Sequence, residues 1–473
     1  MPRKKPTAAH RADATDSPLS VVILAAGQGK RMLSDLPKVL QPLAGMPLLA
    51  HVLDIAGSLS PASIHVVYGH AGERVRAAFK DRPVQWSHQS QQLGTGHAVR
   101  QAIPSIPDSH RVLVLYGDVP LLRAETLREL IDSVDADGLG WLTARLADPS
   151  GYGRIVRGKH DKPRRIVEQA DASGKERKIK EINTGVLVAG AKLLKGWLSA
   201  LQPRNAQGEY YLTDILELAV AQKCVVATVQ AGDAAEVSGV NDKQQLAQVE
   251  AHYRGRRARE LMAQGVTLID PLRIDVRGPV RVGRDVQLDI NVVLEGPVEL
   301  ADGVSIGPNC VLSRVTIGAG TQVRANCVLQ DAQIGVNCRI GPYTRVRPGS
   351  NLSDDVHLGN FVEIKASRVG TGSKINHLTY VGDSEVGSGV NIGAGTVTCN
   401  YDGANKWTTR IGDGAFIGSG TMLVAPVTVG ENATIGAGST ISNDAPREKL
   451  TVARARQQTI DQWERPRTAS TKT

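Results

Sequence analysis

Two glycines followed by two cations near the start of the chain form a possible phosphate-binding loop. Residues 17–32 read SPLSVVILAAGQGKRM, so Gly27 and Gly29 directly follow an apolar run. Glycines let backbone N–H groups approach phosphate oxygens closely. Arg31 lies just beyond them and Lys38 follows in SDLPKVL, which gives two cations suited to a triphosphate. A plain tight turn and a solvated Lys38 are the alternatives that this pattern leaves open.

A second polar segment follows further along the chain. The sequence QSQQLGTGHAV places Gln89, Gly94 and Thr95 just before a helical pattern. Their amide, hydroxyl and backbone groups form a glycine-rich edge that is able to read a nucleotide base.

An acidic residue stands at the end of a predicted strand. In RVLVLYGDVPLL, the apolar residues 112–115 lead to Tyr116, Gly117 and Asp118. A carboxylate in this position can hold Mg²⁺ against phosphate oxygens, although a strand-end aspartate can also simply begin a turn.

The last third of the chain holds a separate group of reactive side chains. His377 and Tyr380 occur in NHLTYVGD, after Arg347 and Lys365. Histidine has a reference pKa of about 6.5, so it is the side chain best suited to accept a proton near neutral pH. A lone histidine can also be purely structural.

Between residues 398 and 411, the sequence CNYDGANKWTTR interrupts a regular repeat and predicts an outward excursion.

That repeat has a period of six residues and predicts the element that must position these groups. A sustained period of six fits neither an α-helix nor an ordinary strand, and it is typical of a parallel β-helix built from hexapeptides. A glycine-rich β-sandwich is the alternative. The aliphatic positions, with occasional slips of one residue, are Val276, Val282, Leu288, Leu294, Leu300, Ile306, Leu312, Ile317, Val323, Leu329, Ile334, Ile340, Val346, Leu352, Leu358, Ile364, Val369, Ile375, Val381, Val386, Ile392, Ile411, Ile417, Leu423, Val429, Ile435 and Ile441.

Such a stack of coils forms a rigid prism with flat outer faces. These faces favour self-association, and we expect a ring-closed homo-oligomer.

The first half of the chain alternates strand and helix patterns instead. Residues 64–69 and the segment VQWSHQ read as strands, and residues 72–80 read as a helix between them. This alternation predicts a Rossmann-like α/β sheet with its site at the carboxyl ends of the strands. Residues 242–264 read as a connecting helix that ends at Gly265, with Asn241 as a candidate N-cap.

We therefore predict five segments along the chain. They are a disordered basic tail (1–17), an α/β domain (18–240), a linker helix (241–265), a β-helix domain (266–446) and a C-terminal tail (447–473).

Composition narrows the class of protein. The net charge is +9, but the two ends supply six of these charges, and no aromatic interleaving or known nucleic-acid module accompanies them, so we expect no nucleic-acid partner. The longest apolar run is far too short to cross a bilayer. Five cysteines without CxxC spacing favour free thiols in a reducing cytoplasm and argue against zinc.

The order of these motifs resembles bacterial sugar-1-phosphate nucleotidyltransferases. LAAGQGKRM, SDLPK, QQLGTGHA and YGDVPL are followed by GYGRI, IVE, EINTG, NAQGEYYLTD and GVND. Joined to a hexapeptide helix, the set resembles the GlmU family, which combines N-acetylglucosamine-1-phosphate uridyltransferase and glucosamine-1-phosphate acetyltransferase activities. The resemblance covers residues 18–460.

The resemblance implies roles for residues in the first half. Arg31 and Lys38 would be catalytic, and Asp118 and Asn241 would ligate Mg²⁺. Gly153, Glu168, Asn183 and Asn241 would hold the sugar. The residues implied to bind the uridine nucleotide are Leu24, Ala25, Ala26, Gly27, Lys38, Gln89, Gly94, Thr95, Tyr116, Gly117 and Asp118.

It also implies roles in the β-helix. His377 matches the general base, and Arg347, Lys365, Tyr380 and Asn391 match the residues that bind glucosamine 1-phosphate. The residues implied to bind acetyl-CoA are Ala394, Asn400, Tyr401, Ser419, Ala437 and Arg454.

The resemblance implies acetyl transfer from acetyl-CoA to glucosamine 1-phosphate, then uridylyl transfer from UTP to N-acetylglucosamine 1-phosphate with release of pyrophosphate. The repeat also resembles left-handed hexapeptide β-helix proteins, which implies a left-handed β-helix and a homotrimer. Two other classes of protein combine the same two folds: a monofunctional sugar-1-phosphate nucleotidyltransferase whose β-helix is regulatory or oligomerising, and a non-catalytic nucleotide-exchange regulator. Lys38, Asp118 and Asn241 argue against the regulator. A γ-type carbonic anhydrase would need several histidines, and only His357 and His377 lie in the repeat.

Overall fold

The computed structural model describes residues 17–69 and 71–466 and forms two compact units, Met1–Tyr253 and Arg254–Thr473. The predicted basic tail lies outside the described residues except for Ser17, and so do the last seven residues of the predicted C-terminal tail. No helix in the described part of the chain is long and apolar enough to span a membrane.

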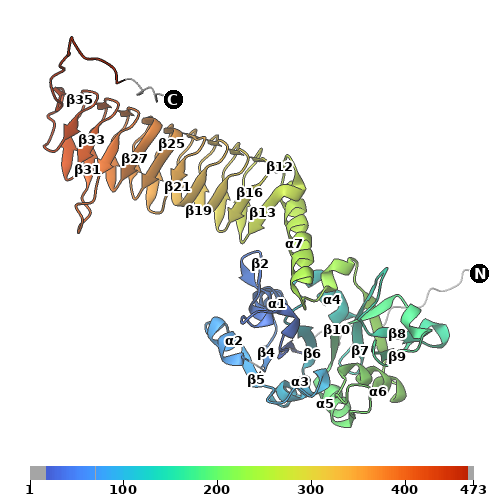
Figure 1. Ribbon diagram of the computed structural model, residues 1–473. Helices are drawn as coiled ribbons and strands as arrows, with labels where there is room; N and C mark the ends of the chain where they lie inside the picture. Colours follow the sequence, from blue (N-terminus) through green and yellow to red (C-terminus); the bar gives the residue numbers. More distant parts are fainter. Residues whose placement is uncertain (1–16, 70, 467–473) are drawn as a thin grey trace, which may run out of the picture. The chain divides into compact units, whose positions relative to one another are not determined.

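A seven-stranded path of a mixed sheet forms the centre of the first unit (Figure 1). β10 is antiparallel to its neighbours β6 and β7, and the other pairs along the path are parallel. In sheet order the strands are β11 (Val226–Gln230), β7 (Leu139–Arg145), β10 (Glu181–Gly190), β6 (Arg111–Tyr116), β1 (Leu19–Ala25), β4 (Ser63–Tyr68) and β5 (Gln85–His88). The hairpin of β8 (Arg154–Arg157) and β9 (Pro163–Val167) pairs with β10 off this path.

Helices cover both faces of this sheet because the buried strands are apolar on both sides. In β1, Val21 and Ile23 join one core cluster, while Val22 and Leu24 join the other. The first cluster contains α1 (Leu48–Gly57), α2 (Gly72–Ala78) and α4 (Ala124–Asp132), and the second contains α3 (Thr95–Ala102), α5 (Ala191–Ala200) and α6 (Ile215–Ala221). This arrangement confirms the predicted Rossmann-like α/β fold.

A specific hydrogen bond from a backbone N–H group marks each end of the long helix α7 (Lys243–Ala263). Asp242 caps its start by accepting a hydrogen bond from the backbone N–H of Gln245 at 2.8 Å, so the prediction that Asn241 is the N-cap is wrong. At the other end, Gly265 has φ +93° and donates its N–H to the carbonyl of Met262 at 3.0 Å. This left-handed turn confirms Gly265 as the end of the helix.

The second unit is a parallel β-helix, as the six-residue period predicts. Its 26 short strands run from β12 (Thr267–Leu268) to β37 (Leu450–Thr451), and each coil pairs in parallel with the next. Leu288 pairs with Ile306 18 residues later, and Ile417 pairs with Ile435. Every aliphatic position of the predicted array is buried except Val282, which is half-buried.

The slips in the repeat lie at one corner of the prism. The strands on either side are β19 (Val311–Ile317), β21 (Val328–Ile334), β25 (His357–Lys365), β26 (Arg368–Val369), β27 (Lys374–Gly382) and β28 (Ser384–Val386). Where only five residues separate successive core positions, one corner residue takes the left-handed conformation. These residues are Arg314 (φ 52°), Asp331 (45°), Ala366 (44°) and Asp383 (49°). A slip is therefore a corner shortened by one residue, and the inward pattern continues without a break.

The half-buried position in the array provides a matched test of core packing. Val323→Ala removes two methyl groups from a fully packed interior and should lower the unfolding free energy by on the order of 2 kcal/mol. Val282→Ala, the same change at the half-buried position, should cost less than half as much. Urea denaturation followed by circular dichroism measures both, and equal losses would contradict the packing described here.

Candidate functional sites

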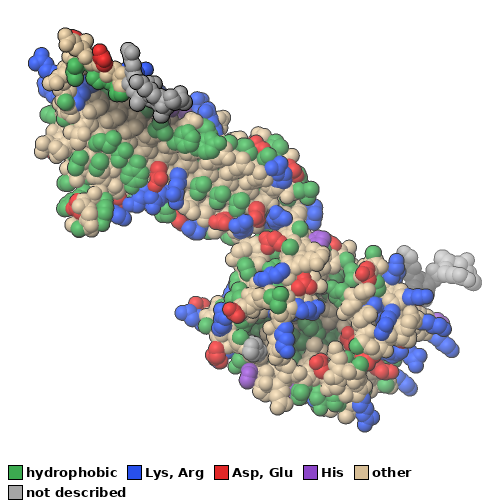
Figure 2. Space-filling model, in the orientation of Figure 1, with side chains coloured by type: hydrophobic (Ala, Val, Ile, Leu, Met, Phe, Trp, Pro, Cys, Tyr) green, Lys and Arg blue, Asp and Glu red, His purple; other side chains and the backbone are tan. Residues whose placement is uncertain are grey.

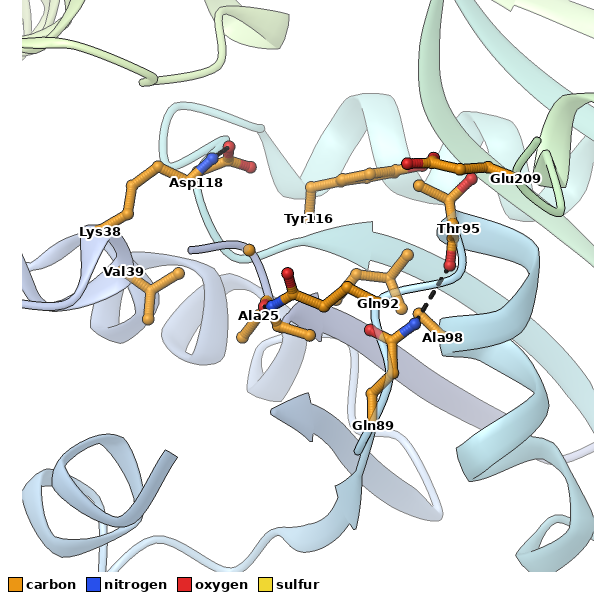
Figure 3. Close-up of a pocket in the computed structure, with 14 residues that line it drawn as sticks. Ala25, Lys38, Val39, Gln89, Gln92, Thr95, Ala98, Tyr116, Asp118 and Glu209 are labelled. Atoms are coloured by element: carbon orange, nitrogen blue, oxygen red, sulfur yellow. Dashed lines mark hydrogen bonds and ion pairs between the residues drawn. The ribbon is translucent and has the colours of Figure 1, made fainter. Parts of the chain in front are cut away.

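A cavity of about 320 Å³ opens at the carboxyl ends of β1 and β6 (Figure 3). It is lined by Leu24, Ala25, Ala26, Gly27, Lys38, Val39, Gln89, Gln92, Gly94, Thr95, Ala98, Tyr116, Asp118 and Glu209. The structure thus brings together ten of the eleven residues that the sequence predicts to bind the nucleotide. Gly117 is the exception, and a Cβ there would lie 3.3 Å from Leu49 and Val39 and 3.4 Å from Ala25.

Charged and amide oxygens converge at one end of this cavity. The ammonium group of Lys38 donates to Asp118 and, at 3.2 Å, to Oδ1 of Asn241. The segment before Asn241 is held in place because the N–H of Val240 donates to the carbonyl of Asp118 at 2.9 Å. Two hard oxygen ligands therefore already face a cation.

The opposite wall is organised by amide side chains. Nε2 of Gln89 donates to the carbonyl of Gly94 at 3.2 Å and lies 3.0 Å from Nδ1 of His97. Burial lowers the pKa of His97, so a neutral ring can accept this hydrogen bond. Gln92 donates to the carbonyl of Ala26 at 2.7 Å and fixes the chain just before the glycine loop.

Two glycines permit close packing around the site. Gly94 has φ +106°, and a Cβ there would lie 2.7 Å from the carbonyl oxygen of Tyr210. Gly185 has φ +81°, and a Cβ there would lie 2.4 Å from the ring of Tyr116. The first approach brings the segment of Glu209 to the cavity, and the second lets Tyr116 pack closely against β10.

Three of the four residues implied to hold the sugar lie beside one another. The N–H of Asn183 donates to the carbonyl of Gly153 at 2.8 Å, and a Cβ on Gly153 would lie 3.0 Å from Glu168 Oε2. Oδ1 of Asn183 accepts from the indole of Trp141 and from the N–H of Gly185, both at 2.7 Å. These two bonds fix the rotamer of the Asn183 amide. The fourth residue, Asn241, lies at Lys38 instead.

Burial dominates the electrostatics around this cluster. It raises the pKa of Glu168, while a hydrogen bond from Thr213 at 3.1 Å opposes the shift. Burial, together with Glu168 and Asp118, also raises the pKa of Tyr116, which keeps the phenol protonated as a hydrogen-bond donor. Burial and the nearby Glu217 and Asp171 raise the pKa of Asp214 to about 6.

Arg31 lies apart from the cavity. It is exposed in the short helix η1 (Lys30–Met32), does not line the cavity, and has no ion pair within the described residues. Its predicted catalytic role stays a prediction.

Sequence reasoning missed four lining residues: Val39, Gln92, Ala98 and Glu209. Gln92 and Ala98 flank the glycine-rich segment around Gly94, so their position in that segment was an available signal. Glu209 comes from a distant part of the chain, and its own segment gives no local sign that it reaches the cavity.

On the β-helix, the residues implied to bind acetyl-CoA form a column. Ala394, Ser419 and Ala437 occupy the same angular position as His377 in three successive coils. Backbone bonds link these coils at the corner: the N–H of Gly420 donates to Ala394 and that of Gly438 to Ser419, at 2.7 and 2.8 Å. These four residues are distant in sequence but lie in one column along the prism.

Arg454 reaches the far end of this column. Nη1 of Arg454 donates to the carbonyl of Ala437 at 2.5 Å, although the side chain is exposed.

The residues implied to bind glucosamine 1-phosphate divide between two faces. Arg347 pairs with Glu363 at 2.8 Å, and Lys365 pairs with Asp383 at 3.0 Å on the same face. Tyr380 lies beside Glu363 in register on that face. Asn391, in β29 (Asn391–Ile392), instead pairs with Lys374 on the face that precedes His377.

The predicted excursion is an ordered hairpin between β30 (Val397–Cys399) and β31 (Thr409–Ile411), and it projects from the stack in Figure 1. Asp402 accepts hydrogen bonds from the backbone of Ala404 and Asn405 and from the indole of Trp407 at 2.6 Å. These bonds lower the pKa of Asp402 to about 2. Tyr401 is exposed on the hairpin and Asn400 is buried at its base.

The raised pKa of Asp214 predicts how stability depends on pH. The folded state holds this proton more tightly than the unfolded chain, so Asp214 stabilises the fold at low pH, and this contribution is lost as pH rises through about 6. Relative to wild type, Asp214→Asn should therefore be more stable at pH 7.5 than at pH 5, as measured by thermal unfolding. Asp108→Asn is the control, because Lys195 lowers the pKa of Asp108 and this carboxylate is ionised at both pH 5 and pH 7.5. The difference in stability between Asp108→Asn and wild type should therefore be the same at the two pH values. A pH-independent difference for Asp214→Asn would contradict the assignment.

Three family models match separate parts of the chain. Residues 21–184 match the MobA-like NTP transferase domain, residues 276–380 match the GMPPB C-terminal domain, and residues 408–443 match the bacterial transferase hexapeptide with six repeats.

Curated relatives match the chain over nearly its whole length. A bifunctional protein GlmU of Alkalilimnicola ehrlichii is 56% identical over 448 residues, which cover 95% of this chain and 96% of the relative. The protein of the same name from Aromatoleum aromaticum is 56% identical, with 95% and 98% covered, and that of Chromobacterium violaceum is 54% identical, with 96% and 99% covered. Because this identity extends over 95% of the chain and therefore across both folds, the chain belongs to the GlmU family of bifunctional proteins.

Proposed function

We propose that the protein makes UDP-N-acetylglucosamine in two steps, one at each site. Acetyl-CoA first acetylates glucosamine 1-phosphate on the β-helix, and UTP then reacts with N-acetylglucosamine 1-phosphate in the α/β unit. The observation that carries this proposal is that two reactive clusters, one around Lys38 and Asp118 and one around His377, stand on two different folds that the relatives also combine. The product supplies peptidoglycan and lipopolysaccharide synthesis.

In the acetyl transfer, His377 acts as the general base. The sugar ammonium must lose a proton before its nitrogen attacks the thioester carbonyl, and His377 stands on an open corner where a substrate can reach it. Arg347, Lys365 and Tyr380 lie on the adjoining face to hold the sugar phosphate, with Asn391 supplied from the other face. The column from Ala394 to Ala437, with Asn400, Tyr401 and Arg454, lies along the path proposed for acetyl-CoA. CoA leaves as the thiol when the tetrahedral intermediate collapses.

In the uridylyl transfer, positioning and charge neutralisation supply most of the catalysis. A phosphate oxygen of the sugar phosphate attacks the α-phosphorus of UTP, and the bond to the bridging oxygen breaks to release pyrophosphate. Lys38, at the cavity, and Arg31, in the exposed helix η1, would neutralise the departing charge. Gly153, Glu168 and Asn183 would hold the sugar, and Gln89 and the glycine loop would hold the nucleotide.

The cavity fits Mg²⁺ as the metal of this step. Asp118 and Asn241 present a carboxylate and an amide oxygen to one cation, Lys38, and these are the oxygen ligands that Mg²⁺ takes. Within residues 17–69 and 71–466, no group of three or more His, Cys, Asp or Glu side chains is placed to hold a metal. Phosphate oxygens of the substrate would therefore complete the coordination, and the ion would neutralise their charge.

The separation of the sites predicts two independent losses of function. His377→Ala should abolish release of free thiol from acetyl-CoA but leave uridylyl transfer within about twofold of wild type, because it removes the only base proposed for the first step. Asp118→Ala should do the reverse. Thiol release and pyrophosphate release are followed in separate assays, and loss of both activities in either variant would refute two separate sites.

We further propose that the protein is a homotrimer assembled through the β-helix. At one corner of the prism, nine successive coils place a left-handed residue: Asn291, Asn309, Asn326, Tyr343, Phe361, Leu378, Gly395, Gly420 and Gly438. Asparagine and glycine adopt this conformation readily, whereas other residues are disfavoured by about 1–2 kcal/mol.

The three bulky residues of this corner form an exposed apolar ridge. Tyr343, Phe361 and Leu378 are 51%, 56% and 63% exposed, and the rings of Tyr343 and Phe361 stack at 5.1 Å. Figure 2 shows hydrophobic side chains exposed over much of the β-helix face in view. Strained and exposed apolar groups next to His377 are well explained if a second copy covers them.

The distribution of the sugar-phosphate residues supports the same arrangement. Tyr380 and Asn391 lie on different faces of one prism, on either side of the corner that carries His377. If faces of two copies meet, Asn391 of one chain can lie opposite Tyr380 of another, which would complete the site.

The five free cysteines, three of them buried, suit a reducing compartment, so we place the trimer in the cytoplasm.

The ridge can be interrupted at its middle residue without disturbing the coil. Phe361→Asn restores the residue type found at Asn309 and Asn326 in the same corner, so each protomer should stay folded while self-association weakens at least tenfold. Acetyl transfer should fall with it and uridylyl transfer should not. Sedimentation velocity measures the assembly, with Asn309→Gly as the control that removes no apolar area. An unchanged assembly in Phe361→Asn would show that the ridge has another purpose.

A further inference from the structure

Asp383 lies at a corner of the β-helix and contacts two residues that have been assigned to different substrates. Its Oδ2 accepts a hydrogen bond from the ammonium of Lys365 at 3.0 Å. The same oxygen accepts a hydrogen bond from Nδ2 of Asn400. The side chains of Lys365 and Asp383 are only 18% and 21% exposed, so solvent competes weakly for this pair.

We propose that Asp383 is a positioning residue for acetyl transfer, which holds Lys365 for the sugar phosphate and Asn400 for acetyl-CoA in one shared hydrogen-bonded unit. This inference rests on the proposed acetyltransferase site, in which Lys365 and Asn400 touch the two substrates. Asp383 itself touches neither. It sets the distance between the two groups that do.

The geometry leaves little freedom to the three side chains. Asp383 donates its own N–H to the carbonyl of Lys365 at 2.9 Å, so its backbone is tied to the residue whose side chain it orients. The hydrogen bond to Asp383 raises the pKa of Lys365 and keeps the ammonium charged, ready for a phosphate.

Asn400 connects this unit to the excursion that carries Tyr401. Its carbonyl accepts the N–H of Trp407 at 2.8 Å, which closes the base of the hairpin. Because Asn400 is buried, its amide needs a partner, and Asp383 supplies one. Without this acceptor, the base of the hairpin would lose the hydrogen bond that joins Asn400 to the corner of the prism.

Other corners in the same column show that an aspartate here is not required by the fold. Ala366 occupies the equivalent corner one coil earlier with φ 44°, nearly the conformation of Asp383 at 49°. Asp331 occupies it in an earlier coil with φ 45°, and its carboxylate pairs with Arg314 on the exposed surface. Alanine is therefore compatible with this turn, and Asp331 provides a matched control away from the site.

The test is Asp383→Ala in the full-length protein. We expect KM for glucosamine 1-phosphate and KM for acetyl-CoA each to rise about tenfold, since each substrate loses a group held by a charge-assisted hydrogen bond. We expect kcat to fall less than threefold, because His377 is not disturbed, and uridylyl transfer to stay unchanged. Amide hydrogen exchange in residues 400–408 should accelerate.

Asp331→Ala should change neither KM nor exchange in the hairpin. Asp383→Asn, which keeps the turn and one acceptor oxygen, should give intermediate KM values and serves in place of the alanine variant if that variant does not fold. The inference is overturned if both KM values stay within twofold of wild type, if only one rises, or if Asp331→Ala has the same effect. A wild-type protein that releases no thiol from acetyl-CoA would instead refute the proposed acetyl transfer itself.

Discussion

Parallel pairing of each coil with the next is the constraint on which the second half of the molecule depends. Since Leu288 must pair with Ile306, and Ile417 with Ile435, every inward position is committed to the core. Only outward positions and corners are free to carry chemistry. Regular stacking then places residues that are distant in sequence in straight columns, as His377 and Ser419 are, so a long substrate such as acetyl-CoA can follow one edge of the prism.

In the first unit, the geometry of a parallel sheet brings the polar groups of the site together. The carboxyl ends of parallel strands meet at one edge of a sheet, and β1 and β6 deliver the glycine loop and Asp118 to that edge. Lys38 bridges the oxygens of Asp118 and Asn241, so the elements that surround the cavity are joined by charge as well as by packing. In both units a rigid framework fixes polar groups that have little freedom of their own.

Much of this architecture could be predicted from the sequence because its signals are local and repeated. The period of six identified the buried side of every coil, and the alternating apolar runs identified the strands β1 and β6. Slips in the repeat looked like interruptions, but they are corners shortened by one residue, as at Asp331 and Ala366. Aspartate tolerates such a turn as asparagine does, but Arg314 and Ala366 give no sign of it, so the slips could be located from the sequence but their cause could not.

The parts that sequence reasoning missed depend on contacts between distant segments. Glu209 reaches the nucleotide cavity because Gly94 lets its segment approach, and no feature near Glu209 predicts this. Asp242 caps α7 and leaves Asn241 to Lys38, a choice between neighbours that only the geometry decides. Asp383 lies in NHLTYVGD, within reach of Lys365 and Asn400, but its link between them follows from the stacking of coils.

The central claim is that two sites on two frameworks act in succession on one sugar phosphate, and omission of single substrates tests it most directly. With glucosamine 1-phosphate, acetyl-CoA, UTP and Mg²⁺ present, the wild-type protein should release thiol and pyrophosphate. Withholding UTP should stop pyrophosphate release alone. Withholding acetyl-CoA should stop both until N-acetylglucosamine 1-phosphate is added, which should restore pyrophosphate release without thiol. Absence of thiol release in the complete mixture, or pyrophosphate release at full rate from unacetylated sugar phosphate, would contradict this account.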